Sequence, residues 1–192
     1  MKVASIKRNL KEFREIKESQ STDYNCGAYA LYYCYSLLGY RDCPDSIDKR
    51  LFSSTISKMW RYSLGTLPSQ LLKVIEKDGV KSSELMCDDN NDRGFFNMLD
   101  EHLAQDGNAI MFVNCGHWIS IVGKKGRSYI VRDPAYKKPY LKQLSRSELC
   151  RIGWNEMELE FGIGEPLSIG AGLFLKDWGR LGFAGRYAIL LG

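Results

Sequence analysis

A histidine, an aspartate and a cysteine form the most reactive combination of residue types in this sequence. His117 and Asp133 lie in two strand-like runs, NCGHWISIVG and SYIVRDPAY, that are joined by the basic turn KKGR. If this hairpin is centred on Lys125, its register pairs position 117 with position 133, and directly opposed side chains of antiparallel strands share one face. The imidazole would then stand beside a carboxylate that fixes its tautomer.

Far upstream, the run QSTDYNCGAYALYYC places Cys26 at the start of an apolar helix. Only the thiolate form of cysteine is a nucleophile, and a helix N-terminus and a neighbouring imidazolium both favour this form. Cys26 is therefore the candidate nucleophile, His117 its general base and acid, and Asp133 the residue that orients the imidazole. Acyl transfer also needs donors for the oxyanion, and the backbone N–H of Cys26 and the side-chain amide of Gln20 are candidates.

The elements that must position these residues begin with helices. A charged stretch with an apolar stripe predicts a helical arm over residues 3–19, and residues 26–38 are apolar on nearly every side, as in a buried helix. Asp23 and Asn25 are possible N-caps of this helix, and Gly39 is its expected C-cap. Its tyrosines are expected to belong to the core: Tyr29, Tyr32, Tyr33 and Tyr35.

Further helices and then strands are expected along the chain. Residues 41–46 predict a loop, 47–60 a second helix, 66–77 a helix capped by Thr66 and ended by Asp78-Gly79, 88–94 a loop, and 95–105 an amphipathic helix. From residue 108 the pattern changes to the strands AIMFVNC, HWISIVG and SYIVRD. The runs EMELEFGIG, LSIGAGLFL and GRYAILLG predict glycine-interrupted strands that complete the sheet or wrap the domain. Helices followed by an antiparallel sheet predict an α+β fold.

Length and composition fit a single globular domain of 192 residues. The net charge of +4 is spread along the chain, which gives no support to a nucleic-acid partner. No apolar run is long enough to cross a membrane, and the N-terminus is too charged for a signal peptide. We therefore expect a cytoplasmic protein without membrane insertion, or one exported as an effector without a cleaved signal. The oligomeric state is left open.

Six cysteines occur without a C-x-x-C pair, and no histidine lies at zinc-finger spacing from a cysteine pair. We expect reduced, mostly buried thiols, no metal and no cofactor. Cys34 is expected to be a structural thiol and Cys115 to belong to the core.

Several residues admit a second interpretation. Asp133 precedes a proline, and an Asp-Pro pair often only starts a turn. Trp118 either shields the ion pair from water or fills the core. His102, on the predicted helix 95–105, is the competing candidate for the base, but it has no hairpin partner and is typical of a solvated helical histidine.

Four segments together resemble the papain-like cysteine peptidases, and in particular the bacteriocin-processing double-glycine leader peptidases: Q-STDYN-CGAYAL, LGTLPSQLLKVIEKDGV, GHWISIVG and YIVRDPAY. The resemblance implies a papain-like fold with a helical lobe packed on an antiparallel sheet. It also implies that Cys26 is the nucleophile, His117 the base and acid, Asp133 the orienting residue and Gln20 the oxyanion-hole amide. It covers residues 20–136, within an expected catalytic core over 20–150 that is flanked by the arm 1–19 and an extension 151–192.

The expected function is that of a bacterial cysteine peptidase that cleaves a peptide or protein substrate through a thioester intermediate. The same triad in a protein deamidase or acyltransferase, acting as an effector or toxin, is the first alternative, since a fold does not determine the reaction. A binding module with a vestigial site is the second alternative. That alternative predicts the loss of Cys26, Gln20 or His117, and all three are present.

Overall fold

The computed structural model describes residues 19–22, 24–55, 57–58, 65–87, 92–114, 116–136, 141–153, 155–156 and 184–192. The predicted arm lies outside this part of the chain except for its last residue, and so do Asp23, Cys115 and the predicted strand LSIGAGLFL.

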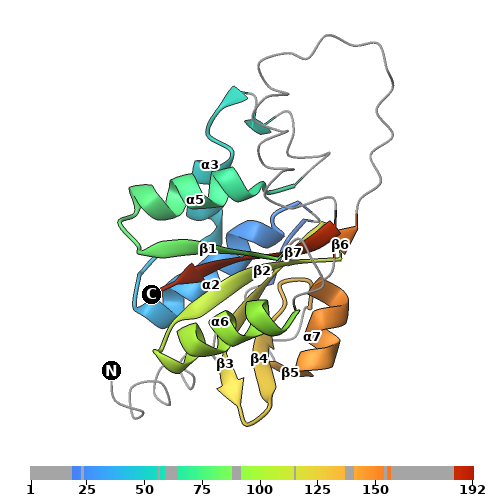
Figure 1. Ribbon diagram of the computed structural model, residues 1–192. Helices are drawn as coiled ribbons and strands as arrows, with labels where there is room; N and C mark the ends of the chain where they lie inside the picture. Colours follow the sequence, from blue (N-terminus) through green and yellow to red (C-terminus); the bar gives the residue numbers. More distant parts are fainter. Residues whose placement is uncertain are drawn as a thin grey trace.

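The described strands form an antiparallel sheet whose last strand in sequence lies inside it (Figure 1). Ala188 on this strand pairs with Leu85 on one side and with Met111 on the other. GRYAILLG was predicted as a strand that completes the sheet or wraps the domain, and the first of these two roles is the one observed. The strands follow the order β1 (Ser82–Cys87), β7 (Ala184–Leu191), β2 (Asn108–Val113), β3 (His117–Lys125), β4 (Ser128–Arg132) and β5 (Lys142–Ser145), and the short β6 (Asn155–Glu156) pairs with β7.

Helices cover both faces of the sheet, as Figure 1 shows for α2 behind it and α6 in front. One core lies between the sheet and α2 (Cys26–Leu38), α3 (Pro44–Leu51) and α5 (Pro68–Lys77). The other lies between the sheet and α6 (Asp92–Ala104) and α7 (Arg146–Gly153). Side chains alternate along β2 accordingly, with Ile110 in the first core and Met111 in the second. The predicted α+β architecture is confirmed.

The buried helix over residues 26–38 is confirmed at both ends. Along most of α2 the side chains are buried, which follows from the near absence of polar residues on any side. Gly39 ends it with a φ of 83°, a left-handed conformation that glycine adopts without steric cost. Among the predicted core tyrosines, Tyr29, Tyr33 and Tyr35 are buried and Tyr32 is half-buried.

The predicted starts of the other helices are wrong by a few residues. α3 begins at Pro44 and α6 at Asp92, so the loops predicted over 41–46 and 88–94 are both too long, and α3 ends at Leu51. A proline and an acidic residue both suit the first helical turn, where N–H groups have no partner within the helix. At the start of α5, Leu67 rather than Thr66 is the N-cap, and the Gln70 side chain accepts a hydrogen bond from the Leu67 N–H at 2.7 Å.

Three short elements were not predicted, β1, β5 and α7, whereas β6 contains the first residue of the predicted strand EMELEFGIG, whose other residues lie outside the described part of the chain. The three unpredicted elements are polar or very short, so they carry little of the hydrophobic periodicity from which an element can be recognised.

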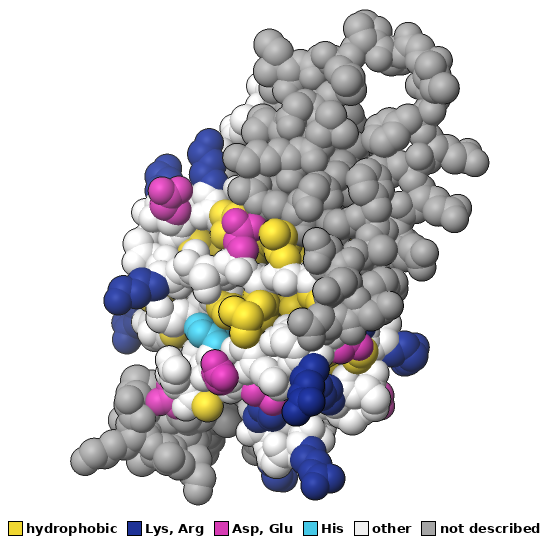
Figure 2. All heavy atoms as spheres, viewed as in Figure 1, with side chains coloured by type: hydrophobic (Ala, Val, Ile, Leu, Met, Phe, Trp, Pro, Cys, Tyr) yellow, Lys and Arg dark blue, Asp and Glu magenta, His cyan; other side chains and the backbone are white. Residues whose placement is uncertain are grey.

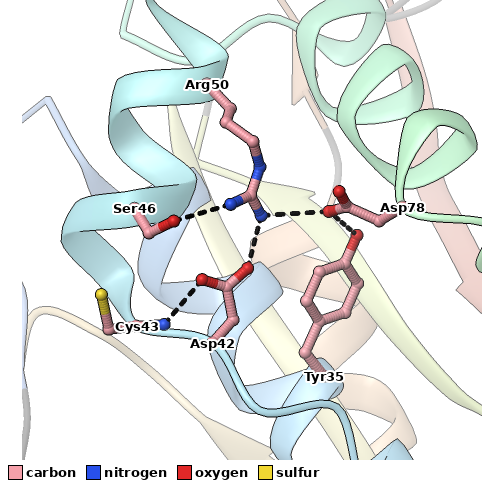
Figure 3. A network of polar contacts seen from close by, with 6 residues as sticks. All are labelled: Tyr35, Asp42, Cys43, Ser46, Arg50 and Asp78. Atoms are coloured by element: carbon pink, nitrogen blue, oxygen red, sulfur yellow. Dashed lines mark hydrogen bonds and ion pairs between the residues drawn. The ribbon is translucent and has the colours of Figure 1, made fainter.

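A polar network joins the C-terminal part of α2 to α3 and to the end of α5 (Figure 3). The Tyr35 hydroxyl donates to Asp78 Oδ2 at 2.9 Å, and Arg50 Nη2 donates to the same oxygen at 3.0 Å. Arg50 also bonds Asp42 and Ser46. Although burial opposes ionisation of the Asp42 carboxyl, its hydrogen bond with Arg50 lowers its pKa. The network therefore fixes the end of α2 that lies farthest from Cys26.

No helix within the described ranges is long and apolar enough to cross a membrane.

Candidate active site

Cys26 is the first residue of α2 and is buried, with 2% of its surface exposed. Asn25 occupies the N-cap position, but its side chain makes no capping hydrogen bond. Instead it closes the preceding loop, because its Oδ1 accepts from the Thr22 N–H at 3.4 Å and its Nδ2 donates to Ser21 Oγ at 3.1 Å. The positive end of the helix dipole, which favours an anion, therefore lies directly at the thiol.

His117 is the first residue of β3, and its Nε2 lies 2.7 Å from Asp133 Oδ1. The same carboxylate oxygen accepts the N–H of Ala135 at 3.0 Å, which holds it in place just after β4. With Nε2 donating to Asp133, the ring presents Nδ1 to its other partner, the Cys26 thiol. The structure thus brings together the predicted nucleophile, base and orienting residue.

The imidazole of His117 and the carboxyl of Asp133 each stabilise the charged form of the other. Burial opposes protonation of the imidazole, but its hydrogen bonds with Asp133 and with Cys26 raise the pKa of His117 to about 9. Burial likewise opposes ionisation of Asp133, yet the hydrogen bond with His117 lowers the pKa of this carboxyl. Near neutral pH the arrangement therefore favours an imidazolium beside an ionised carboxylate.

The hairpin that carries His117 and Asp133 has a different centre from the predicted one. Gly126 has a φ of 61° at the first central position of a two-residue loop, where glycine is favoured. The register then shifts between Ile121 and Gly123, so Val122 is an extra residue and forms a β-bulge. The observed pairs are Lys125–Ser128, Lys124–Tyr129, Gly123–Ile130, Ile121–Val131 and Ser120–Arg132.

This bulge determines whether His117 can reach Asp133. Continuing the register beyond Ser120–Arg132 brings position 117 opposite position 135, so the predicted pairing of 117 with 133 is wrong by two residues. Because side chains alternate with a period of two, a shift of two keeps His117 and Asp133 on one face as diagonal neighbours. Without Val122 as an extra residue the shift would be three, and the two side chains would point to opposite faces. The contact was predicted correctly, but counting from the turn could not reveal the bulge.

Gln20 lies beside the loop that carries Asp133. Its backbone N–H donates to the Pro134 carbonyl at 3.0 Å, which links the segment before Cys26 to the segment after β4. The side-chain Oε1 of Gln20 is buried and has no hydrogen-bond partner within the described residues.

The remaining candidates lie outside this group. His102 is half-buried rather than solvated, and its Nε2 lies 3.1 Å from the carbonyl oxygens of both Asn108 and Leu191, so it joins α6 to the sheet. Cys34 is fully buried, and burial raises the pKa of its thiol to about 12. Trp118 is a core residue, 1% exposed, whose indole N–H bonds the Thr66 carbonyl.

The described cysteines are free, and three of them are buried: Cys26, Cys34 and Cys87. Within the described ranges, no three histidine, cysteine or acidic side chains come together as metal ligands would.

Comparison with known proteins identifies the fold of this chain through solved structures. No protein-family model and no curated protein sequence matches the chain. Several solved structures are similar to it, among them the following three. A double-glycine-motif protease from an AMS/PCAT transporter, in complex with the leader peptide, shares 18% identity with a TM-score of 0.50, over 70% of this chain and 81% of that one. The peptidase domain of Streptococcus ComA, a bifunctional ABC transporter involved in quorum sensing, shares 16% identity with a TM-score of 0.52, over 70% of this chain and 89% of that one.

The third structure, a candidate C39-like peptidase from Bacillus anthracis, shares 12% identity with a TM-score of 0.53, over 93% of this chain and 95% of that one. These likenesses confirm the predicted papain-like fold of helices packed on an antiparallel sheet. The solved structures that share the fold include double-glycine peptidase domains, the group that the sequence motifs resemble.

Proposed function

We propose that this chain is a cysteine peptidase that cleaves a peptide bond with Cys26 as its nucleophile. The observation that carries the proposal is the position of the His117 ring, which bonds Asp133 through Nε2 at 2.7 Å and also interacts with the Cys26 thiol. A buried thiol at a helix N-terminus, next to an imidazole held by a carboxylate, is the arrangement that activates a cysteine for acyl transfer.

The first half of the reaction forms a thioester. The Cys26 thiolate attacks the carbonyl carbon, a C–S bond forms, and the carbonyl electrons move to the oxygen. As the intermediate collapses, the C–N bond breaks and the His117 imidazolium gives its proton to the leaving amine. In the second half, His117 takes a proton from water, the hydroxide displaces the thiolate, and the product is a carboxylic acid. Asp133 keeps the ring oriented through both halves.

Stabilisation of the oxyanion is assigned to the backbone N–H of Cys26 and the side-chain amide of Gln20. In support, the backbone of Gln20 is tied to Pro134, beside Asp133, and its Oε1 has no competing partner within the described residues. The NH₂ group of a glutamine amide carries two donors, and a substrate oxyanion can accept one of them.

The substrate class that this chemistry suits is a peptide or a protein segment. The complex of the similar double-glycine-motif protease with its leader peptide supports a peptide substrate for this fold.

Labelling with iodoacetamide followed by peptide mapping tests the nucleophile. Cys43 is exposed and serves as an internal reference, whereas Cys34, eight residues after Cys26 on the same helix, is fully buried. We expect Cys26 to react faster than Cys43 at pH 6, where an ordinary thiol is almost entirely protonated. Cys26→Ala should abolish cleavage of a peptide library, whereas Cys34→Ala should retain it.

Equal slow labelling of Cys26 and Cys43 would contradict the proposal. Fast labelling of Cys26 without cleavage of any peptide would instead favour the deamidase or acyltransferase alternative.

A further inference from the structure

Thr66 contacts the residue that follows each of two proposed catalytic residues. Gly27, next to Cys26, packs so closely on Thr66 that a Cβ at position 27 would come within 2.6–2.7 Å of the Cβ, Cγ2 and Oγ1 atoms of Thr66. Trp118, next to His117, donates its indole N–H to the Thr66 carbonyl oxygen at 2.8 Å. One residue therefore touches both α2 beside the thiol and β3 beside the imidazole.

Both contacts are held rigidly. Thr66 is 3% exposed and Trp118 is 1% exposed. The Trp118 ring packs edge-on against the rings of Phe112 and Tyr187, with centroids 5.1 and 6.0 Å away. The atoms of Thr66 that face Gly27 include its Cβ, which no side-chain rotation can move away.

The segment around Thr66 has little freedom to shift. Gly65 has a φ of 64°, and a Cβ at that position would lie 3.7 Å from the Tyr24 carbonyl oxygen, so this segment also runs beside the loop that leads to Cys26. On the other side, the Leu67 N–H is bonded by Gln70 in the first turn of α5. The segment around Thr66 is thus held in place by contacts with the loop before Cys26, with α5 and with β3.

We propose that Thr66 is a positioning residue that sets the separation between the Cys26 thiol and the His117 imidazole, an inference that rests on the proposed function. Cys26 belongs to a helix and His117 to the sheet, and each lies one residue, about 3.8 Å between Cα atoms, from its contact with Thr66. A displacement of Thr66 is therefore passed to the reacting pair nearly undiminished. A misplacement of about 1 Å can cost roughly a hundredfold in rate.

The first test replaces the Trp118 indole with a smaller aromatic ring that cannot donate the hydrogen bond to Thr66. Trp118→Phe is compared with Ser120→Ala, which removes another buried 2.8 Å hydrogen bond from the same strand, between Ser120 Oγ and the Ala30 carbonyl of α2. Two quantities are measured for each variant: the rate of Cys26 alkylation by iodoacetamide from pH 5 to 9, and the midpoint of unfolding. We expect Trp118→Phe to slow alkylation at pH 6 by about tenfold or more and to change the shape of the pH profile. Ser120→Ala should lower the unfolding midpoint comparably and leave the profile within about twofold of the wild type.

The second test uses the packing against Gly27 and does not depend on Trp118. Gly27→Ala should slow alkylation by about tenfold or more in the wild type but by less than about twofold in a Thr66→Gly background, where the added methyl group has room. Thr66→Gly keeps the carbonyl that Trp118 bonds. An equal effect of Gly27→Ala in both backgrounds would overturn the inference, and so would matching profiles for Trp118→Phe and Ser120→Ala.

The two proposals fail in different ways. If Cys26 of the wild type reacts no faster than the exposed Cys43 at pH 6, the proposed function fails and the role of Thr66 fails with it. If Cys26 reacts fast in the wild type and the variants behave like their controls, only the role of Thr66 is wrong.

Discussion

Replacement of Asp133 by asparagine tests the electrostatics of the site without requiring a substrate. The rise of the His117 pKa from its ordinary 6.5 to about 9 corresponds to about 3 kcal/mol of stabilisation of the imidazolium, at 1.36 kcal/mol per pKa unit. Burial is the largest influence on this ring and opposes protonation, while the bond with Asp133 is the largest influence that favours it. Asp133→Asn keeps an oxygen acceptor and removes the charge, so we expect the pKa of His117 to fall by about one unit or more.

NMR titration of the imidazole Cε1–H signals measures this change directly. The chain has only two histidines, so a His102→Gln variant assigns both signals. Cys26→Ala should also lower the midpoint of His117, because a hydrogen bond and a charge interaction with Cys26 both raise the pKa of this imidazole. A wild-type midpoint near 6.5, or a midpoint that does not move in Asp133→Asn, would refute this reasoning.

The same shift predicts how stability depends on pH. Because the pKa of His117 is higher in the folded than in the unfolded chain, its contribution is fully present below about pH 6.5 and is lost as the pH rises to about 9. The lowered pKa of Asp133 acts at the other end, since its contribution is lost as the pH falls below the ordinary range of a carboxyl. Urea unfolding of the wild type against Asp133→Asn should show the difference largest between about pH 4 and 6.5.

Three further changes separate catalysis from stability. His102→Gln should cost about 1–2 kcal/mol of unfolding free energy, because two carbonyls lose their donor, and should leave Cys26 alkylation unchanged; a large loss of alkylation would make His102 the better candidate base. Gln20→Ala should lower kcat for peptide cleavage by about 10²–10³ while alkylation persists, and an unchanged kcat would exclude its amide from the oxyanion site. Deletion of Val122 should abolish fast alkylation and return the His117 titration to a lower pH, whereas retention of both would mean that the bulge does not set the contact.

The sequence predicted those features that rest on local patterns. The apolar run of α2 and the glycine at its end specify a buried helix, and the short apolar runs rich in β-branched and aromatic residues in β2, β3 and β4 specify strands. That His117 and Asp133 lie at the same end of one hairpin was also predictable, whereas their position on one face depends on the bulge.

Long-range features could not be predicted in the same way. The register depends on an extra residue at Val122, and nothing in a nearly continuous apolar run distinguishes a bulged residue from a paired one. The placement of β7 between β1 and β2 joins segments about a hundred residues apart. Thr66 looked like a helix cap because of its type and position, whereas its structural role comes from Gly27 and Trp118, which are distant in sequence. A glycine directly after the proposed catalytic cysteine was the one available signal, since glycine permits a close approach.

The contacts at the two ends of α5 restrict the length of that helix. Thr66, just before α5, meets Gly27 near the start of α2, and Asp78, just after α5, accepts the Tyr35 hydroxyl near the end of α2. The two helices therefore run in the same direction. The ten residues of α5 rise about 15 Å along its axis. The α2 segment between its two contact residues, Gly27 and Tyr35, rises about 12 Å. One inserted residue would turn Asp78 by about 100° around the helix axis, so only one of the two contacts could survive. In related chains that keep both contacts, we expect insertions and deletions to fall in the surrounding loops and to spare α5.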